Sequence, residues 1–166
     1  EIIKALPQKY TCNFAFVAHC LQRSERCALI LPRGVLTSKE EKECRRYFIE
    51  KGWLQAAISL PEKMFESTSV ATCILLFDKK KTSKDVMLIN AEQMKTVEVR
   101  EQRGEGEASH YNRIYKKEFN TFSDEQLVAI CELLHKEQEG YSKKVSIEEL
   151  LNHNYNLDIG PYLPIY

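Results

Sequence analysis

The side chains with the greatest capacity for chemistry are six cysteines and four histidines, and their spacing predicts no metal site. The cysteines form no Cys-x-x-Cys pair, which is the usual signature of a zinc site. The histidines are scattered along the chain and form no recognisable metal-ligand motif. Most cysteines have apolar neighbours, as reduced cysteines do in the core of a protein from a reducing compartment. We therefore expect no bound metal.

Other catalytic signatures are also missing. Gly104-Glu105-Gly106 is a Gly-x-Gly, but it lies in a charged stretch without the apolar strand that must precede a dinucleotide-binding loop. No Gly-x-Ser-x-Gly nucleophile elbow occurs. Residue by residue, the sequence predicts a globular domain whose catalytic chemistry is absent or incomplete.

Composition predicts one hydrophobic core and no general affinity for acidic partners. The chain has 166 residues, 43% of them hydrophobic, which suits a single domain. Twenty-four Lys and Arg balance 24 Asp and Glu, so a nucleic-acid or membrane partner would have to meet a local patch. No apolar run approaches the roughly 18 residues of a membrane helix, and no secretory signal is evident. We expect a soluble, cytoplasmic protein with no membrane partner.

The hydrophobic pattern predicts alternating helices and strands in the first half of the chain. Apolar residues at helical spacing predict a helix over about 10–22, and the run 27–31 is typical of a strand buried on both faces. Ser38 to Glu41 has the pattern of a capping box for a helix over 39–51 that ends at Gly52. Further strands are predicted over 53–60, 69–77 and 86–89. This order indicates an α/β fold with a mixed sheet and a terminal hairpin.

The second half is predicted to be less regular. The Glu, Gln, Arg and Gly content near residue 100 indicates a linker or irregular region over 101–122 that separates the domain 1–100 from a C-terminal helical tail, 123–166. Capping boxes at Ser123 with Gln126 and at Ser146 with Glu149 predict two helices in this tail. Its last residues, 152–166, carry large apolar side chains that require a partner surface.

Several ordered blocks carry a family resemblance. They are Asn13-Phe14-Ala15-Phe16-Val17-Ala18-His19, Ala28-Leu29-Ile30-Leu31-Pro32-Arg33-Gly34-Val35-Leu36, Ala57-Ile58-Ser59-Leu60-Pro61-Glu62-Lys63-Met64-Phe65 and Thr72-Cys73-Ile74-Leu75-Leu76-Phe77, followed in the tail by Val145 to Leu150 and Asn154 to Leu157. Together they resemble the methylation (M) subunit of type I restriction-modification systems, which are adenine-N6 DNA methyltransferases. The resemblance is weak between about 92 and 140.

The resemblance implies the C-terminal half of a Rossmann-like S-adenosylmethionine-dependent methyltransferase sheet. The family binds S-adenosylmethionine through a Gly-rich loop and holds the adenine with an Asn/Asp-Pro-Pro-Tyr/Phe motif, and this chain contains no Pro-Pro pair. We therefore expect Glu1 to be a fragment boundary. S-adenosylmethionine is expected in the complete enzyme but not on this chain, which should be inactive alone and prone to self-association. The partners that the resemblance implies are DNA and the specificity and restriction subunits.

The resemblance also suggests site residues. Phe65 matches the position where the family carries an aromatic residue at the edge of the active site, so it is the candidate for the base pocket; the alternative is that its ring plugs the end of the sheet. Candidate DNA contacts are Arg33, which could instead pair with a surface carboxylate, and the lysines Lys79, Lys80 and Lys81, which could simply be solvated. No catalytic residue is predicted in this chain.

A different class of function remains open. A natural protein that kept only this half could be a non-catalytic protein-interaction module derived from the same fold, with its tail docked on a partner. The missing Pro-Pro motif favours this alternative if Glu1 is near the natural start of the protein. The coding sequence upstream of Glu1 distinguishes the methyltransferase hypothesis from the interaction-module hypothesis.

Overall fold

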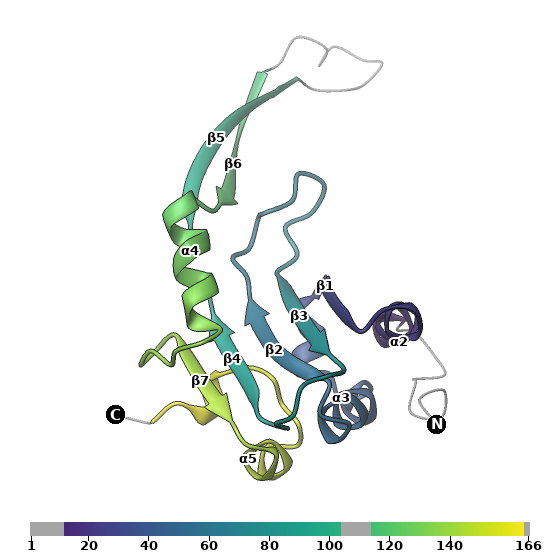
Figure 1. Cartoon of the computed structure of the whole chain (residues 1–166). Coiled ribbons are helices and arrows are strands. Elements are labelled where there is room, and N and C mark those ends of the chain that lie inside the picture. The colour runs from purple at the N-terminus through teal and green to yellow at the C-terminus, as the bar shows by residue number, and fades with distance from the viewer. Residues whose placement is uncertain (1–11, 104–113, 165–166) are drawn as a thin grey trace.

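A five-stranded mixed sheet forms the centre of the computed structural model, which describes residues 12–103 and 114–164 (Figure 1). The strand order is β1-β3-β2-β4-β7, and β1, β2 and β4 run opposite to β3 and β7. This confirms the predicted α/β fold with a mixed sheet. The bounds are β1 Arg26–Pro32, β2 Leu54–Ser59, β3 Thr72–Asp78, β4 Val86–Asn90 and β7 Ser142–Val145.

The central strands are apolar because both of their faces are covered. Ile58 of β2 lies between Ile74 of β3 and Ile89 of β4, which places β-branched side chains next to one another across three strands. One face of the sheet carries the larger core, in which the Phe48 ring packs 5.3 Å from that of Phe77. The other face carries a smaller core beneath helix α4. The sheet is therefore the rigid layer that positions the loops at its ends.

The prediction that the first strand is buried on both faces is wrong. Strand β1 lies at the edge of the sheet, and among the described residues only β3 pairs with it. Leu31 points into the larger core and is 7% exposed, whereas Ile30 points to the other face and is 56% exposed. A continuous apolar run shows that a strand needs cover on both sides, but it does not show whether the chain itself provides that cover.

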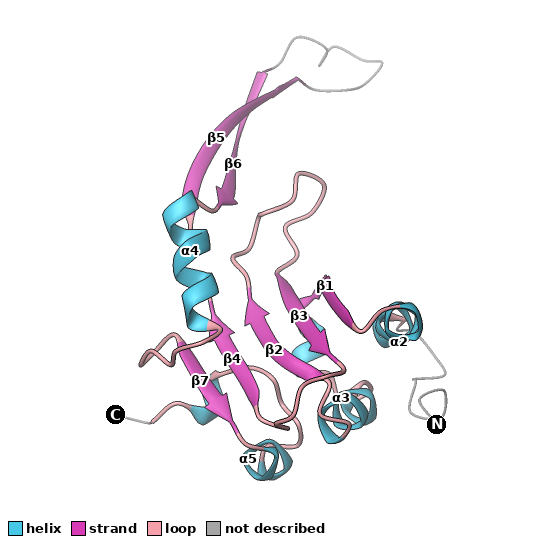
Figure 2. Cartoon of the chain, viewed as in Figure 1, coloured by secondary structure: helices cyan, strands magenta, loops and turns pink. Residues whose placement is uncertain are grey.

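In the described part of the chain, four α-helices accompany the sheet, and Figure 2 shows where they lie. Their bounds are α2 Asn13–Arg23, α3 Lys42–Glu50, α4 Asp124–Leu133 and α5 Ile147–Asn152, and all four were predicted. The capping boxes at Ser123 and Ser146 are present as predicted, and Gly52 ends α3 with a φ of 73°. The predicted cap of α3 is wrong, because Ser38 donates to the side chain of Glu40 and no side chain caps the helix. No helix in the described ranges is long and apolar enough to cross a membrane.

Most of the described part of the predicted linker, 101–122, is regular structure instead. Strands β5 (Thr96–Arg103) and β6 (Ile114–Thr121) pair as an antiparallel hairpin that extends away from the sheet (Figure 1). Val97 and Val99 alternate with polar residues on β5, but both are more than half exposed. Because few side chains of this hairpin are buried, its composition resembles that of a loop, and the sequence therefore predicted a linker. The Gly-x-Gly at 104–106 lies outside the described residues.

The C-terminal residues do not form a separate helical tail. Strand β7 pairs with β4 and completes the five-stranded sheet. After α5, the side chains of Tyr155, Leu157, Ile159 and Tyr162 are buried in the larger core. The apolar residues that were predicted to require a partner surface therefore find it on the sheet of the same chain.

Candidate functional site

Three loops meet at one edge of the sheet because the parallel strands β1, β2 and β4 all end there. Arg33 follows β1, the loop 60–71 follows β2, and Glu92 follows β4. The Arg33 guanidinium lies 2.7 Å from a carboxylate oxygen of Glu92, which fits the alternative in which Arg33 pairs with a surface carboxylate. Open α/β sheets bind ligands at this carboxyl edge, so the three loops define the candidate site.

Phe65 lies in the loop that follows β2. Its side chain is 39% exposed, and it belongs to neither core of the sheet. The loop folds back on itself through a bridge between Phe65 and Thr68, and Lys63 has a φ of 55°, a left-handed conformation that is uncommon outside glycine. The ring is more exposed than the residues of either core, which fits a place at the edge of the site, and its role stays a prediction.

The hairpin β5–β6 holds this loop in place. Asn120 donates from its side chain to the carbonyl of Glu62 at 2.6 Å and from its backbone to the carbonyl of Lys63 at 3.0 Å. Further along the hairpin, Arg100 pairs with the Glu66 carboxylate at 3.0 Å, and Lys117 donates to the Glu66 carbonyl at 2.7 Å. The hairpin is thus part of the site.

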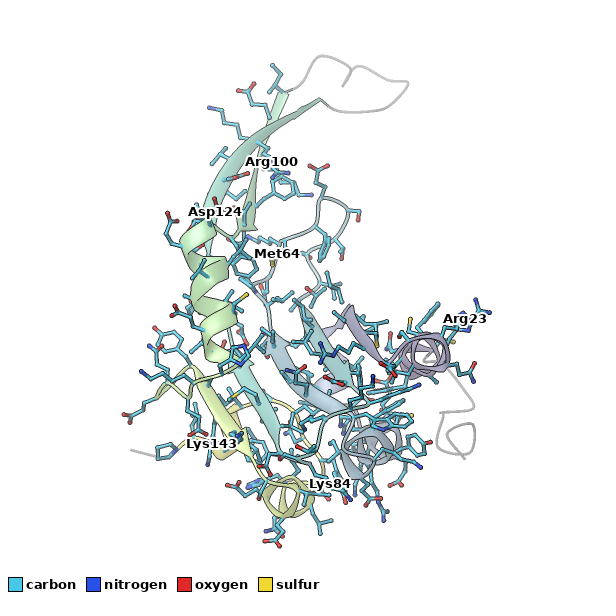
Figure 3. The ribbon with its side chains drawn as sticks, viewed as in Figure 1. Arg23, Met64, Lys84, Arg100, Asp124 and Lys143 are labelled. Carbon is cyan, nitrogen blue, oxygen red and sulfur yellow. The ribbon has the colours of Figure 1, made fainter. Side chains whose placement is uncertain are left out.

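A pocket of about 470 Å³ lies between the loop and β6. Its floor includes Phe119, which is 1% exposed and has the charged groups of Arg100 and Lys117 at 5.1 and 5.2 Å from its ring centre. Figure 3 labels Arg100 on the hairpin and Met64 in the loop that follows β2. The lining combines aromatic, cationic and hydroxyl groups with one carboxylate: Lys63, Phe65, Ser67, Thr68, Ser69, Lys116, Lys117, Glu118 and Phe119. Such a set can stack on a base and bind a phosphate oxygen.

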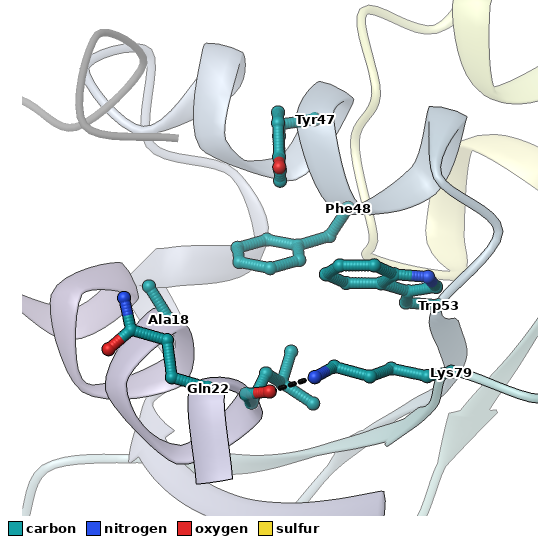
Figure 4. Close-up of a pocket in the computed structure, with 7 residues that line it drawn as sticks. Ala18, Gln22, Tyr47, Phe48, Trp53 and Lys79 are labelled. Atoms are coloured by element: carbon teal, nitrogen blue, oxygen red, sulfur yellow. Dashed lines mark hydrogen bonds between the residues drawn. The ribbon is translucent and has the colours of Figure 1, made fainter. Parts of the chain in front are cut away.

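The three lysines predicted as DNA contacts lie at the opposite edge, because they follow the end of the antiparallel strand β3. Lys79 donates to the carbonyl of Leu21 and stands 5.3 Å from the ring centre of Trp53 (Figure 4). Lys81 donates to the carbonyls of Leu54 and Asp85, and its burial lowers the pKa of its ammonium group.

Lys80 is exposed and pairs with Glu25 at 2.7 Å, so it is solvated as the simpler alternative proposed. The structure therefore does not bring these three lysines together with Phe65. Two of them bind carbonyl groups of their own chain, and none of them follows one of the parallel strands that end at the candidate site.

The buried cysteines offer no nucleophile. Burial raises the pKa of Cys44 to about 11 and that of Cys73 to about 12, so both thiols are protonated at neutral pH. Both side chains belong to the larger core, as expected for cysteines with apolar neighbours. Within residues 12–103 and 114–164, no three His, Cys, Asp or Glu side chains are grouped so that they could hold a metal ion.

The fold is that of an α/β protein with a mixed sheet, and the candidate site lies at the carboxyl edge of its parallel strands. The sequence matches the family model of the N-6 DNA methylases over residues 2–165, and the chain belongs to this family. It is 27% identical over 156 residues to the methylase subunit of the type I restriction enzyme MpnII of Mycoplasma pneumoniae, and 25% identical over 171 residues to that of HindI of Haemophilus influenzae. The resemblance seen in the sequence is confirmed.

A solved structure shares the fold. The fold is similar to that of a type I restriction-modification methyltransferase subunit from Streptococcus thermophilus, with a TM-score of 0.70 and 24% identity over 90% of this chain. The chain spans 26% of the MpnII subunit, 35% of the HindI subunit and 30% of the Streptococcus structure. It therefore corresponds to about a quarter to a third of these relatives.

Proposed function

We propose that this chain forms the C-terminal part of the catalytic sheet of an adenine-N6 DNA methyltransferase of a type I restriction-modification system, and that Phe65 stacks on the flipped target adenine. The observation that carries the proposal is the exposed Phe65 ring at the carboxyl edge, next to a pocket with lysines and hydroxyl groups. Enzymes that act on a base in duplex DNA must turn it out of the helix and stack it in such a pocket.

The unpaired edge of the sheet supports the proposal that this chain is one part of a larger catalytic domain. Among the described residues, β1 has a partner on one side only, and its face around Ile30 is exposed. An apolar strand with unpaired backbone groups is the place where further strands of a larger sheet would add. The Gly-rich loop and the Asn/Asp-Pro-Pro-Tyr/Phe motif expected for the family would come with those strands, and with them the binding of S-adenosylmethionine.

The groups present in this chain indicate what it would contribute to the complete enzyme. The adenine amino group is a poor nucleophile until oxygen acceptors orient it toward the methyl donor, and this chain contributes no such motif. Its own contribution is a stacking platform, Phe65, in a loop that Asn120 holds through the carbonyl of Glu62. The complete enzyme would work in the cytoplasm on DNA, together with specificity and restriction subunits.

Replacing Phe65 in the complete enzyme tests this function. Phe65→Ala should remove roughly 1–3 kcal/mol of stacking, which corresponds to a roughly 5- to 150-fold loss in methylation, with an unchanged melting temperature. Phe65→Trp should retain activity, because a stacking platform accepts a larger ring. Phe16, an exposed Phe on α2, supplies the matched control Phe16→Ala, which should leave methylation unchanged.

Two results would contradict the proposal. Normal methylation by Phe65→Ala would remove the ring from the site, and a stability loss near the roughly 3–5 kcal/mol typical of a buried Phe would make it a core residue. An upstream coding sequence without a Gly-rich loop and Asn/Asp-Pro-Pro-Tyr/Phe motif would instead favour the non-catalytic interaction module.

A further inference from the structure

A second pocket is lined by side chains that can donate hydrogen bonds and includes no carboxylate. It has a volume of about 460 Å³ and lies where the start of α3 meets the turn after α5. Each lining side chain carries an N–H or O–H group, and none is a carboxylate: Thr37, Lys39, Lys42, Arg45, His153, Asn154 and Asn156. We call these seven residues the basic pocket. In a chain with equal numbers of acidic and basic residues, such a set is a local concentration of positive charge.

The buried Arg45 organises the walls of the basic pocket. Its side chain is 2% exposed and donates to the carbonyls of Tyr155 at 2.8 Å, Val35 at 3.0 Å and Ser38 at 2.7 Å. These carbonyls belong to the short helix η1 (Arg33–Leu36), the loop before α3 and the turn after α5. One guanidinium therefore fixes the three segments that carry or adjoin the other lining residues.

Two further contacts hold the turn after α5 against α3. Lys42 donates to the side-chain carbonyl of Asn154 at 3.2 Å, and the backbone of Leu157 donates to the carbonyl of Leu36 at 3.0 Å. Asn154 and Tyr155 are consecutive residues with φ of 56° and 55°, a left-handed conformation that L-residues rarely adopt. Such strained backbone is found preferentially at ligand-binding sites, where the surrounding contacts enforce it.

Carboxylates near the basic pocket are already engaged. Glu41 is buried and accepts a bond from Asn13 at 3.1 Å, while Glu43 lies on α3 at 3.7 Å from Arg46. Glu40 accepts from the hydroxyl of Ser38 at 2.9 Å. None of the three lines the pocket. The ammonium groups of Lys39 and Lys42 thus face a cavity that offers them no counter-ion from its lining.

We propose that the basic pocket is a binding site for a phosphate group. Lys39 and Lys42 would supply charge, and Thr37 and Asn156 would supply neutral donors, a combination that matches the several acceptor oxygens of a phosphate. The phosphate could belong to a DNA backbone or to a small phosphate ester. The site does not depend on the function proposed for Phe65.

Nuclear magnetic resonance of the full chain tests this site. The ¹⁵N-labelled protein is titrated with inorganic phosphate while sodium chloride keeps the ionic strength constant. We expect saturable shifts confined to the amides of 37–42 and 153–156. The double variant Lys39→Gln/Lys42→Gln should bind roughly 100-fold more weakly, about tenfold for each lost charged hydrogen bond. The spectrum of the variant also reports whether it is folded.

A control variant tests whether the effect is confined to the basic pocket, and a second titration tests which kind of phosphate binds there. Lys80→Gln removes an exposed lysine that pairs with Glu25 outside the pocket, and it should leave phosphate binding unchanged. A short DNA duplex that shifts the same amides and displaces phosphate would assign the site to the DNA backbone. Shifts with glycerol phosphate but not with the duplex would assign it to a small ester. Shifts that do not saturate, or that persist in the double variant, would overturn the proposal.

Discussion

Arg45 is predicted to be one of the most sensitive positions for folding. Its guanidinium is buried and binds three backbone carbonyls from segments that are far apart in the sequence. Burial lowers the pKa of Arg45, and the charge of the nearby Glu41 carboxylate, which is also buried, opposes this effect in part. Arg45→Met keeps a side chain of similar length but removes every donor. It therefore isolates the contribution of the hydrogen bonds and the charge.

The magnitude follows from the groups that the substitution leaves behind. Three carbonyl oxygens lose their donor, at about 1–3 kcal/mol for each one that water cannot reach, and the Glu41 charge loses its compensating partner. Because Arg45 lines a pocket that water can enter, we expect the lower part of this range, about 3–5 kcal/mol in all. For a protein of this size, that loss corresponds to a melting temperature lower by roughly 6–20 °C.

Urea denaturation of the two proteins, followed by circular dichroism, measures this difference. The matched control is Arg46→Met, because Arg46 is the next residue along α3 but is exposed, with Glu43 and Glu50 as its partners. Its urea midpoint should stay near that of the unaltered chain, since surface ion pairs contribute little. A midpoint for Arg45→Met that equals that of Arg46→Met would refute the reasoning.

Three further predictions concern the chain in isolation. At pH 8 a thiol reagent should modify the exposed Cys12 and Cys131, but Cys44 and Cys73 only after urea is added, and labelling of Cys73 without urea would contradict the argument. Because thiols in the unfolded chain have a pKa near about 8.5 and Cys44 in the folded chain has a pKa of about 11, the urea midpoint should fall as the pH rises through this interval. Light scattering should detect self-association through the free edge and face of β1, reduced by Ile30→Lys, whereas a clean monomer at high concentration would count against it. Calorimetry with S-adenosylmethionine should show no binding heat, and stoichiometric tight binding would disprove the assignment to a cofactor-free part of the sheet.

Local signals in the sequence predicted much of the secondary structure. The capping boxes at Ser123 and Ser146 and the glycine at position 52 act over three or four residues, so they can be read without knowing the fold. Ordered sequence blocks were also sufficient to assign the family. Neither kind of signal predicts that the charged residue Arg45 of α3 is buried. A helical stripe does not reveal that a charged residue will find three carbonyls.

The site depended on contacts that sequence reasoning could not supply. Asn120 reaches the carbonyl of Glu62 across 58 residues of sequence, in a segment that reads as a linker. The position of the three lysines relative to Phe65 could not be predicted, because the direction of β3 decides at which edge they lie and the antiparallel pairing of β3 with β2 is not visible in composition. Phe65 was found through the family resemblance, and its exposure became known only from the structure.

The pairing of β4 with β7 has a consequence for how this family can vary. The chain leaves the sheet after Asn90 and returns at Ser142, so the hairpin is an excursion between two strands whose pairing holds its ends together. Since the entropy of closing a loop grows only with the logarithm of its length, such an excursion can be shortened, extended or exchanged at little cost. Its contacts through Asn120 are to backbone carbonyls and so place no demand on the side chains opposite. The surroundings of Phe65 can therefore diverge between relatives faster than the sheet that carries it.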